Sequence, residues 1–185
     1  MTTGVPQRDP LLLSMSRLVA NSVFGARKFT DRFVRRLAAH STDKRILEIG
    51  SGKCKNGVYP KSYKNYFDAT NTFVQSDINP EYGHRLVDIT SMQYEEDFDV
   101  ILCLNVLEHV FNLEDAARNL HRATRQSGLV AVVVPALYPL HDEPHDYWRL
   151  TEHSFRRLFG KFKELKIENS GLRRLPFMYS VIARK

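Results

Sequence analysis

The chain has 185 residues, of which 43% are hydrophobic and 26% charged, a size and composition typical of one globular domain and not of a disordered chain. Its formal net charge of +6 favours an acidic partner, such as a phosphorylated metabolite, a nucleic acid or an anionic membrane surface, unless the charge serves only solubility. No apolar run approaches the roughly 18 residues of a membrane-spanning helix, and the N-terminus lacks the layout of a signal peptide, so we expect a cytoplasmic protein.

The N-terminal region predicts a helical extension, residues 1–42, ahead of a main domain at 43–185. Apolar residues recur at helical spacing between positions 11 and 40, and Gly25 is expected to separate two helices. The polar side of this region carries several arginines, as a helix that makes peripheral contact with a membrane does. Packing of the apolar stripe on the chain's own domain is the alternative that we favour.

From position 45 onward, short apolar runs alternate with helical patterns, which predicts an α/β fold with a mostly parallel sheet covered on both faces. One helix is expected to begin after Asn112 and end before Gly128, and another to begin near Thr151. The expected strands are 45–49, 73–78, 85–89, 99–104, 129–134, 162–168 and 177–183.

Ligands of such sheets bind beyond the carboxyl ends of the strands, and a glycine turn closes the first expected strand. Gly50 and Gly52 let the backbone turn tightly and approach a ligand closely. Dinucleotide binding would require a third glycine at the position of Lys55, so this turn does not predict a pyrophosphate site and disfavours a nicotinamide dehydrogenase.

An acid lies at the end of each of the next two expected strands. Asp77 can accept both hydroxyls of a ribose, although it can also be a turn residue ahead of Asn79 and Pro80. Asp88 can accept the amino group of an adenine, or it can cap a helix or form an Asx turn. The pair favours a nucleoside ligand.

Four segments, taken in their order and spacing, resemble the class I (Rossmann-like) S-adenosylmethionine-dependent methyltransferases. These segments are 46–52, 74–77, 87–88 and 98–110. The Leu-Glu-His-Val sequence at 107–110 resembles the branch that acts mostly on small molecules, sugars and lipids. The resemblance implies a seven-stranded sheet whose last strand, 177–183, is antiparallel.

The resemblance also implies S-adenosyl-L-methionine as the cofactor. The glycine turn would pass under its methionine part, with Glu48 supporting that loop. Asp77 would hold the ribose and Asp88 the adenine. The full set of implied cofactor-binding residues is Glu48, Gly50, Ser51, Gly52, Asp77, Ile78, Asp88, Ile89 and Asn105. The chain departs from the family at Cys54, where a third glycine is frequent, and at 53–72, where a short or irregular first helix is expected.

The segment 135–149 is expected to face the acceptor, and it also resembles this branch. Methyl transfer to oxygen or nitrogen needs an in-line nucleophile that loses a proton, and histidine is a suitable base. His141 and His145 are the candidates, with His109 a third. The alternative is that residues 146–149 form a structural staple for the helix that begins near Thr151. The segment is rich in metal ligands, but neighbouring ligands in a loop converge poorly and no distant partners are evident, so no metal is expected.

These observations predict methyl transfer to an oxygen or nitrogen of a small-molecule, sugar or lipid-linked acceptor. The alternative is a catalytically inactive methyltransferase-like binding or activating subunit, against which the retained acids argue. Nucleic acid is not the expected acceptor, because neither a Pro-Pro-Tyr-like run nor a nucleophilic Pro-Cys is present. Basic residues in 11–40 and 53–72 predict an anionic acceptor. The chain could be a monomer or a homodimer.

Overall fold

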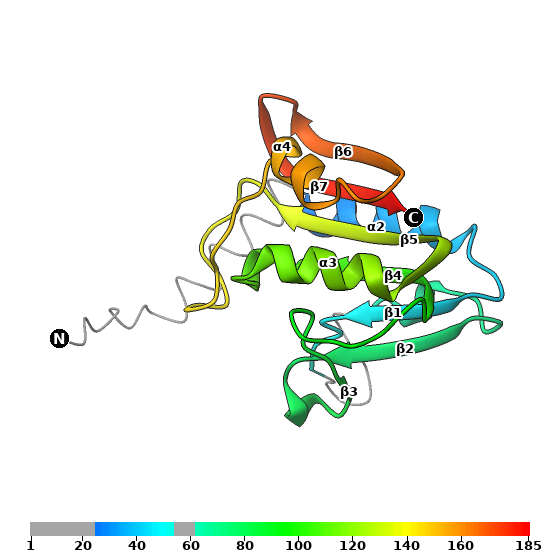
Figure 1. Ribbon diagram of the computed structural model, residues 1–185. Coiled ribbons are helices and arrows are strands. Elements are labelled where there is room, and N and C mark those ends of the chain that lie inside the picture. The colour runs from blue at the N-terminus through cyan, green and yellow to red at the C-terminus, as the bar shows by residue number, and fades with distance from the viewer. Residues whose placement is uncertain (1–24, 54–61) are drawn as a thin grey trace.

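The computed structural model describes residues 25–53 and 62–185 and shows one seven-stranded sheet with the strand order β3-β2-β1-β4-β5-β7-β6 (Figure 1). Strands β1 to β5 pair in parallel, and β7 runs antiparallel to both β5 and β6. The strands are β1 (Arg45–Ile49), β2 (Thr72–Asp77), β3 (Arg85–Leu86), β4 (Phe98–Leu104), β5 (Thr124–Pro135), β6 (Glu164–Leu172) and β7 (Leu175–Arg184). The predicted Rossmann-like sheet with an antiparallel last strand is confirmed.

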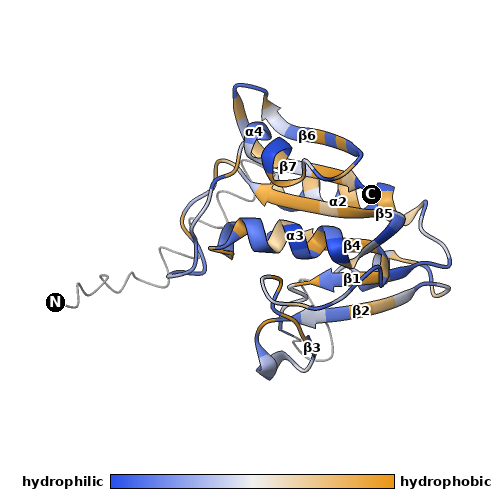
Figure 2. Ribbon diagram, in the orientation of Figure 1, coloured by the Kyte–Doolittle hydropathy of each residue, from blue (hydrophilic) through white to orange (hydrophobic). Residues whose placement is uncertain are grey.

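Helices cover both faces of this sheet, as predicted. Helices α3 (Leu113–Ala123) and α4 (Glu152–Leu158) lie on one face, and α2 (Ala26–Ala38) lies on the other (Figure 1). Alternate residues of each central strand supply the two cores: Leu47 of β1 packs toward α3, whereas Ile46 packs toward α2. Figure 2 shows β5 hydrophobic along most of its length, because both of its faces are buried.

Local sequence signals place the helix ends. The Asn112 side chain accepts the N–H of Asp115 at 3.2 Å, and Thr151 forms a capping box with Ser154. Both predicted helix starts are therefore confirmed. Three short 3₁₀ helices complete the described elements: η1 (Lys64–Tyr66), η2 (Pro80–Tyr82) and η3 (Leu107–His109).

Several strands differ from the prediction in length, and the physical reason is clear for β5 and β3. β5 begins at Thr124, because Thr124 pairs with Phe98 at the start of β4 although the polar residues that follow it carry no strand pattern. β3 ends at Leu86, because the Asp88 carbonyl accepts the N–H groups of Ser91 and Met92 and turns the chain away from the sheet.

Helix α2 packs on the chain's own sheet, which was the favoured alternative. Gly25, with φ of 60°, precedes it, and Phe33, Val34 and Leu37 are buried. The first of the two expected N-terminal helices lies outside the described residues. Within the described ranges, no helix is both long and apolar enough to cross a membrane.

Candidate active site

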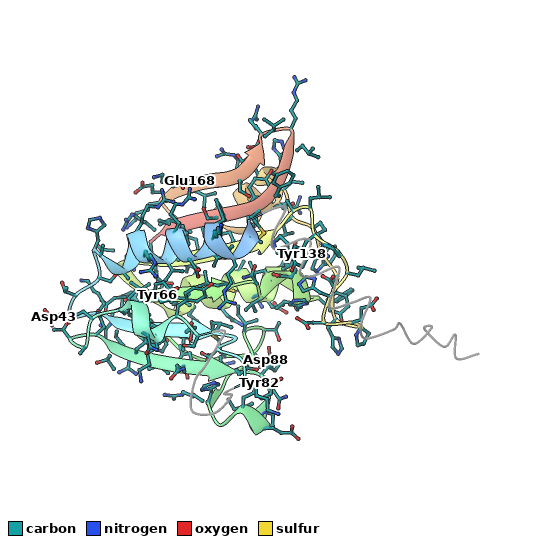
Figure 3. All side chains as sticks on the ribbon, turned by 180° about the vertical axis from the view of Figure 1, so that it is seen from behind. Asp43, Tyr66, Tyr82, Asp88, Tyr138 and Glu168 are labelled. Carbon is teal, nitrogen blue, oxygen red and sulfur yellow. The ribbon has the colours of Figure 1, made fainter. Side chains whose placement is uncertain are left out.

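A cavity of about 740 Å³ opens at the carboxyl ends of β1, β2, β4 and β5. The sheet order reverses here, since β2 and β3 extend from one side of β1 and β4 from the other. Figure 3 shows Tyr82, Asp88 and Tyr138 toward this end of the molecule, opposite Asp43, which precedes β1. The fold therefore places the cavity where parallel sheets bind their ligands.

The glycine turn after β1 forms one wall of the cavity. Gly50 and Gly52 have φ values of 73° and 74°, which favour glycine. A Cβ on Gly50 would lie 2.7 Å from Cγ2 of Val106, so this position has no room for a side chain. Both glycines line the cavity, as expected for a loop that a ligand approaches closely.

Glu48 and Ser51 lie behind this turn and do not line the cavity. The Glu48 carboxylate is buried and accepts the hydroxyls of Ser51 and Ser62 at 2.7 and 2.6 Å and the N–H of Tyr63 at 2.7 Å. Burial raises the pKa of Glu48, and these hydrogen bonds oppose the rise. Both residues hold the turn against the 62–63 segment, so their inclusion among the cofactor-contacting residues is not reproduced by the geometry.

Asp77 joins the ends of β1 and β2 at the cavity wall. Its Oδ2 accepts the N–H of Gly52 at 2.9 Å, and its Oδ1 accepts the N–H of Asn79 at 3.0 Å. Asp77 therefore acts as a turn residue and also lies where a ribose would bind. The two roles are compatible, because each carboxylate oxygen can accept more than one hydrogen bond. His84, which the sequence analysis did not single out, also supports the turn, with Nε2 lying 2.8 Å from the Gly52 carbonyl oxygen.

The next wall combines a carboxylate with apolar side chains. Asp88 forms the Asx-type turn that was one of its two interpretations, because Oδ1 accepts the N–H and hydroxyl of Thr90 at 2.8 and 2.7 Å. Asp88 nevertheless lines the cavity together with Ile78 and Ile89. Ile78 is 68% exposed, which leaves an apolar surface in the cavity available to the face of an aromatic ligand.

Asn105 directly follows β4 and lines the cavity. Its φ of 54° is uncommon for a residue with a side chain, and asparagine tolerates it better than most. The Asn105 N–H donates to the Val133 carbonyl of β5 at 2.7 Å, which fixes this conformation. The backbone of Asn105 is therefore held by the sheet, which limits the positions that its side-chain amide can take.

Beyond Asn105, the cavity wall is formed by His109, Phe111, Tyr138, His141 and Tyr147. His145 is exposed and does not line the cavity; its Nδ1 lies 2.7 Å from the Tyr147 hydroxyl. Of the three histidines proposed as bases, the fold thus brings His109 and His141 together and turns His145 away.

A buried carboxylate lies between these two histidines. Oε1 of Glu108 is 3.9 Å from Nε2 of His109 and 4.0 Å from Nε2 of His141. Burial raises the pKa of Glu108 to about 8. In the sequence, Glu108 stands out only within the Leu-Glu-His-Val segment that carries the family resemblance. The available signal was the adjacent pair Glu108 and His109 within the otherwise apolar run Val106–Val110.

The 146–149 segment acts as a staple between loops, whereas the predicted staple was one for the helix after Thr151. Asp146 accepts two hydrogen bonds from Arg149, at 2.6 and 2.8 Å, and the N–H of His141 at 2.9 Å. Burial opposes ionisation of Asp146, but these hydrogen bonds outweigh it and hold the Asp146 pKa at about 2. The indole N–H of Trp148 donates to the Val110 carbonyl at 3.0 Å, which ties the loop after β5 to the one after β4.

A family of methyltransferase domains matches residues 24–162. The chain belongs to this family. A tRNA U34 carboxymethyltransferase of Sulfurimonas denitrificans is 31% identical over an alignment of 119 residues. The match covers 55% of this chain and 37% of that protein. The chain thus spans little more than a third of the length of this relative.

Solved methyltransferases share the fold. A SAM-dependent methyltransferase from Archaeoglobus fulgidus aligns with a TM-score of 0.64 at 14% identity, over 96% of this chain and 100% of the other. Phosphoethanolamine N-methyltransferase 2 of Haemonchus contortus, solved with S-adenosyl-L-methionine, aligns with a TM-score of 0.59 at 15% identity, over 75% of this chain and 37% of that one.

The chain therefore carries a methyltransferase domain, and solved methyltransferases with this fold, such as the Haemonchus contortus enzyme, bind S-adenosyl-L-methionine. The residues of the cavity fit this cofactor. Asp77 offers a carboxylate for the ribose hydroxyls, Ile78 an apolar surface for the adenine, and the turn at Gly50 a backbone without side chains.

Proposed function

We propose that this protein is an S-adenosylmethionine-dependent methyltransferase that modifies an oxygen or nitrogen of a small-molecule acceptor, such as a sugar or a lipid-linked intermediate. The observation that carries the proposal is one cavity whose lining runs from Asp77 and Asp88 to His109 and His141. Its volume of about 740 Å³ lies in the upper part of the range for ligand pockets, which suits a cofactor and a compact acceptor side by side. The cofactor supplies an electrophilic methyl group.

The chain's own residues would orient the acceptor and activate it. The rings of His109 and His141 meet edge to face with their centroids 4.8 Å apart. The Tyr138 ring packs on His141 in the same way, with a centroid separation of 5.1 Å. We assign acceptor activation, by polarising the nucleophile or taking up its proton, to the group formed by Glu108, His109 and His141. His145 is assigned no such role, because its side chain lies off the cavity wall.

Charge supports an anionic acceptor. Arg27, near the start of α2, lines the cavity, and the chain as a whole has a net charge of +6. A cationic residue at the wall of a cavity attracts and orients phosphate or carboxylate groups. Phe111 and Tyr147, whose rings contact each other with centroids 5.4 Å apart, provide apolar surface for the remainder of the acceptor.

A tRNA acceptor is the second candidate. The relative from Sulfurimonas denitrificans is named for tRNA, and the net positive charge suits a polyanion. The 37% coverage of that protein leaves the rest of its chain without a counterpart in this match. Small-molecule acceptors remain our first proposal because the described activation residues lie in one compact cavity.

The test measures release of S-adenosylhomocysteine from the purified protein with three classes of acceptor. These are phosphorylated or carboxylated sugars, their neutral counterparts, and unmodified tRNA. Turnover with small anions supports the proposal, and turnover with tRNA alone replaces it by the second candidate. His141→Gln should lower turnover by about 10²–10⁴-fold while cofactor affinity measured by calorimetry stays unchanged. His145→Gln is the matched control and should retain turnover.

A further inference from the structure

Three potential metal ligands converge in the acceptor half of the cavity, from two loops distant in sequence. Glu108 and His109 belong to η3 after β4, and His141 belongs to the loop after β5. One ligand atom from each, an imidazole nitrogen of each histidine and a Glu108 carboxylate oxygen, all lie within 4.8 Å of one another. The sequence offered no distant partners for the ligands in 141–146, and the fold supplies them.

The second ring nitrogen of each histidine is already engaged by an oxygen. Nδ1 of His109 lies 2.9 Å from the carbonyl oxygen of His145. Nδ1 of His141 lies 3.2 Å from the Pro139 carbonyl oxygen and 3.2 Å from Oδ2 of Asp146. Oxygens there place the proton on Nδ1 and leave the lone pair on Nε2, the arrangement that metal-binding histidines have.

The carboxylate in the centre has no hydrogen-bond partner in another residue of the described part of the chain, although the charge of Arg149 attracts it. Glu108 is fully buried, and neither Oε1 nor Oε2 makes a hydrogen bond there. Buried carboxylates are paired with a cation or hydrogen bonded in nearly all proteins. An unpartnered carboxylate facing two imidazole lone pairs is the electrostatic pattern of a cation site.

We propose that Glu108, His109 and His141 bind one divalent transition metal ion, with its open coordination positions facing the acceptor cavity. Two imidazoles and one carboxylate form a donor set suited to Zn²⁺ and its neighbours in the first transition row, and unsuited to Mg²⁺ or Ca²⁺. Three protein ligands with the remaining positions open characterise catalytic rather than structural zinc sites.

The distances require a small closure of the site. Metal bonds of about 2.0–2.1 Å hold tetrahedral ligand atoms about 3.4 Å apart. The two carboxylate–imidazole separations of 3.9 and 4.0 Å therefore shorten by about half an ångström when a metal binds, and the imidazole nitrogens of the two histidines, now within 4.8 Å of each other, also move together. The His109 and His141 side chains are 22% and 11% exposed and can rotate by this amount toward the fixed carboxylate.

This inference rests on the proposed function, because the metal would act on the acceptor. A metal with open positions binds an oxygen or nitrogen nucleophile, orients it and lowers its pKa. The contribution of Glu108, His109 and His141 is then to hold the ion, in place of proton uptake by a free imidazole. The residues for the methyl donor, such as Asp77, are not part of the metal site.

The experiment uses the full chain without a histidine tag, stripped with a chelator and titrated with Co²⁺ as a spectroscopic probe. We expect one Co²⁺ per chain with visible ligand-field absorption, displaced by Zn²⁺. Glu108→Gln and His141→Gln should each weaken Co²⁺ binding by at least about tenfold. His145→Gln keeps the backbone carbonyl beside His109, and His153→Gln changes a histidine on α4 whose side chain is 83% exposed. Both controls should bind Co²⁺ as the wild type does.

Cofactor affinity, measured by calorimetry on the same samples, separates the two proposals and reports folding. Wild-type protein that binds S-adenosylmethionine but not Co²⁺ or Zn²⁺ overturns the metal site and leaves the proposed methyl transfer standing. Co²⁺ binding that persists in a folded Glu108→Gln variant and in a His109→Gln/His141→Gln double variant also overturns it. Transfer at the full rate in chelator refutes a role for the metal in the reaction.

Discussion

Replacing Asp77 by asparagine tests the cofactor half of the cavity with almost no change in side-chain size. The Asp77 carboxylate accepts two backbone N–H groups, from Gly52 at 2.9 Å and from Asn79 at 3.0 Å. An asparagine offers one oxygen and one NH₂ group, so one of these N–H groups would face another donor. The NH₂ group also cannot accept a ribose hydroxyl.

Hydrogen bonds to a charged group contribute about 1.5–3 kcal/mol each. Loss of one such bond to the ribose would lower the affinity for S-adenosylmethionine by about 10–150-fold, since about 1.4 kcal/mol corresponds to a factor of ten. The strained contact at Gly52 or Asn79 should also cost about 1–2 kcal/mol of folding free energy, a fall in Tm of roughly 2–8 °C.

Calorimetric titration with S-adenosylmethionine and thermal unfolding measure the two effects separately. Asp43→Asn is the matched control, because it removes the same charge from an exposed residue at the opposite end of the molecule (Figure 3). Its affinity should equal that of the wild type. Unchanged affinity in a folded Asp77→Asn variant would refute the ribose role of Asp77.

Three further predictions concern the turn, an ion pair and the charge of the rim. Gly50→Ala should destabilise the protein by about 1–3 kcal/mol and weaken cofactor binding, because its Cβ would meet Val106 and its φ is positive; chemical denaturation measures the loss. Glu168→Gln should cost about 0.2–1 kcal/mol at neutral pH, because Arg36 and Lys166 lower the pKa of Glu168. That difference is present above the ordinary pKa of 4.5 and disappears as the pH falls below it, so equal stabilities of variant and wild type at pH 7 would contradict the pairing. Added salt should lower kcat/KM with an anionic acceptor while cofactor affinity stays nearly constant, and salt-independent kinetics would leave the net charge without a role in acceptor capture.

Much of the fold followed from patterns that act over a few residues. The alternation that sends Leu47 to one core and Ile46 to the other is a property of the extended chain, and it is visible in the sequence. Asn112 and Thr151 marked helix starts because their side chains bond to the adjacent turn. The start of β5 was missed because Thr124 pairs with a strand distant in sequence, which no local pattern records.

The half of the cavity assigned to the cofactor could be predicted from local pattern alone. Its residues lie at the ends of parallel strands, and parallel strands bring their carboxyl ends to one edge, so Gly50, Asp77 and Asn105 meet there. The half assigned to the acceptor could not be predicted in this way. Whether His141 or His145 faces the cavity depends on the Asp146–Arg149 staple, and the approach of Glu108 depends on two loops packing together. Side-chain directions in loops are set by such long-range contacts, because no repeating backbone geometry fixes them in advance.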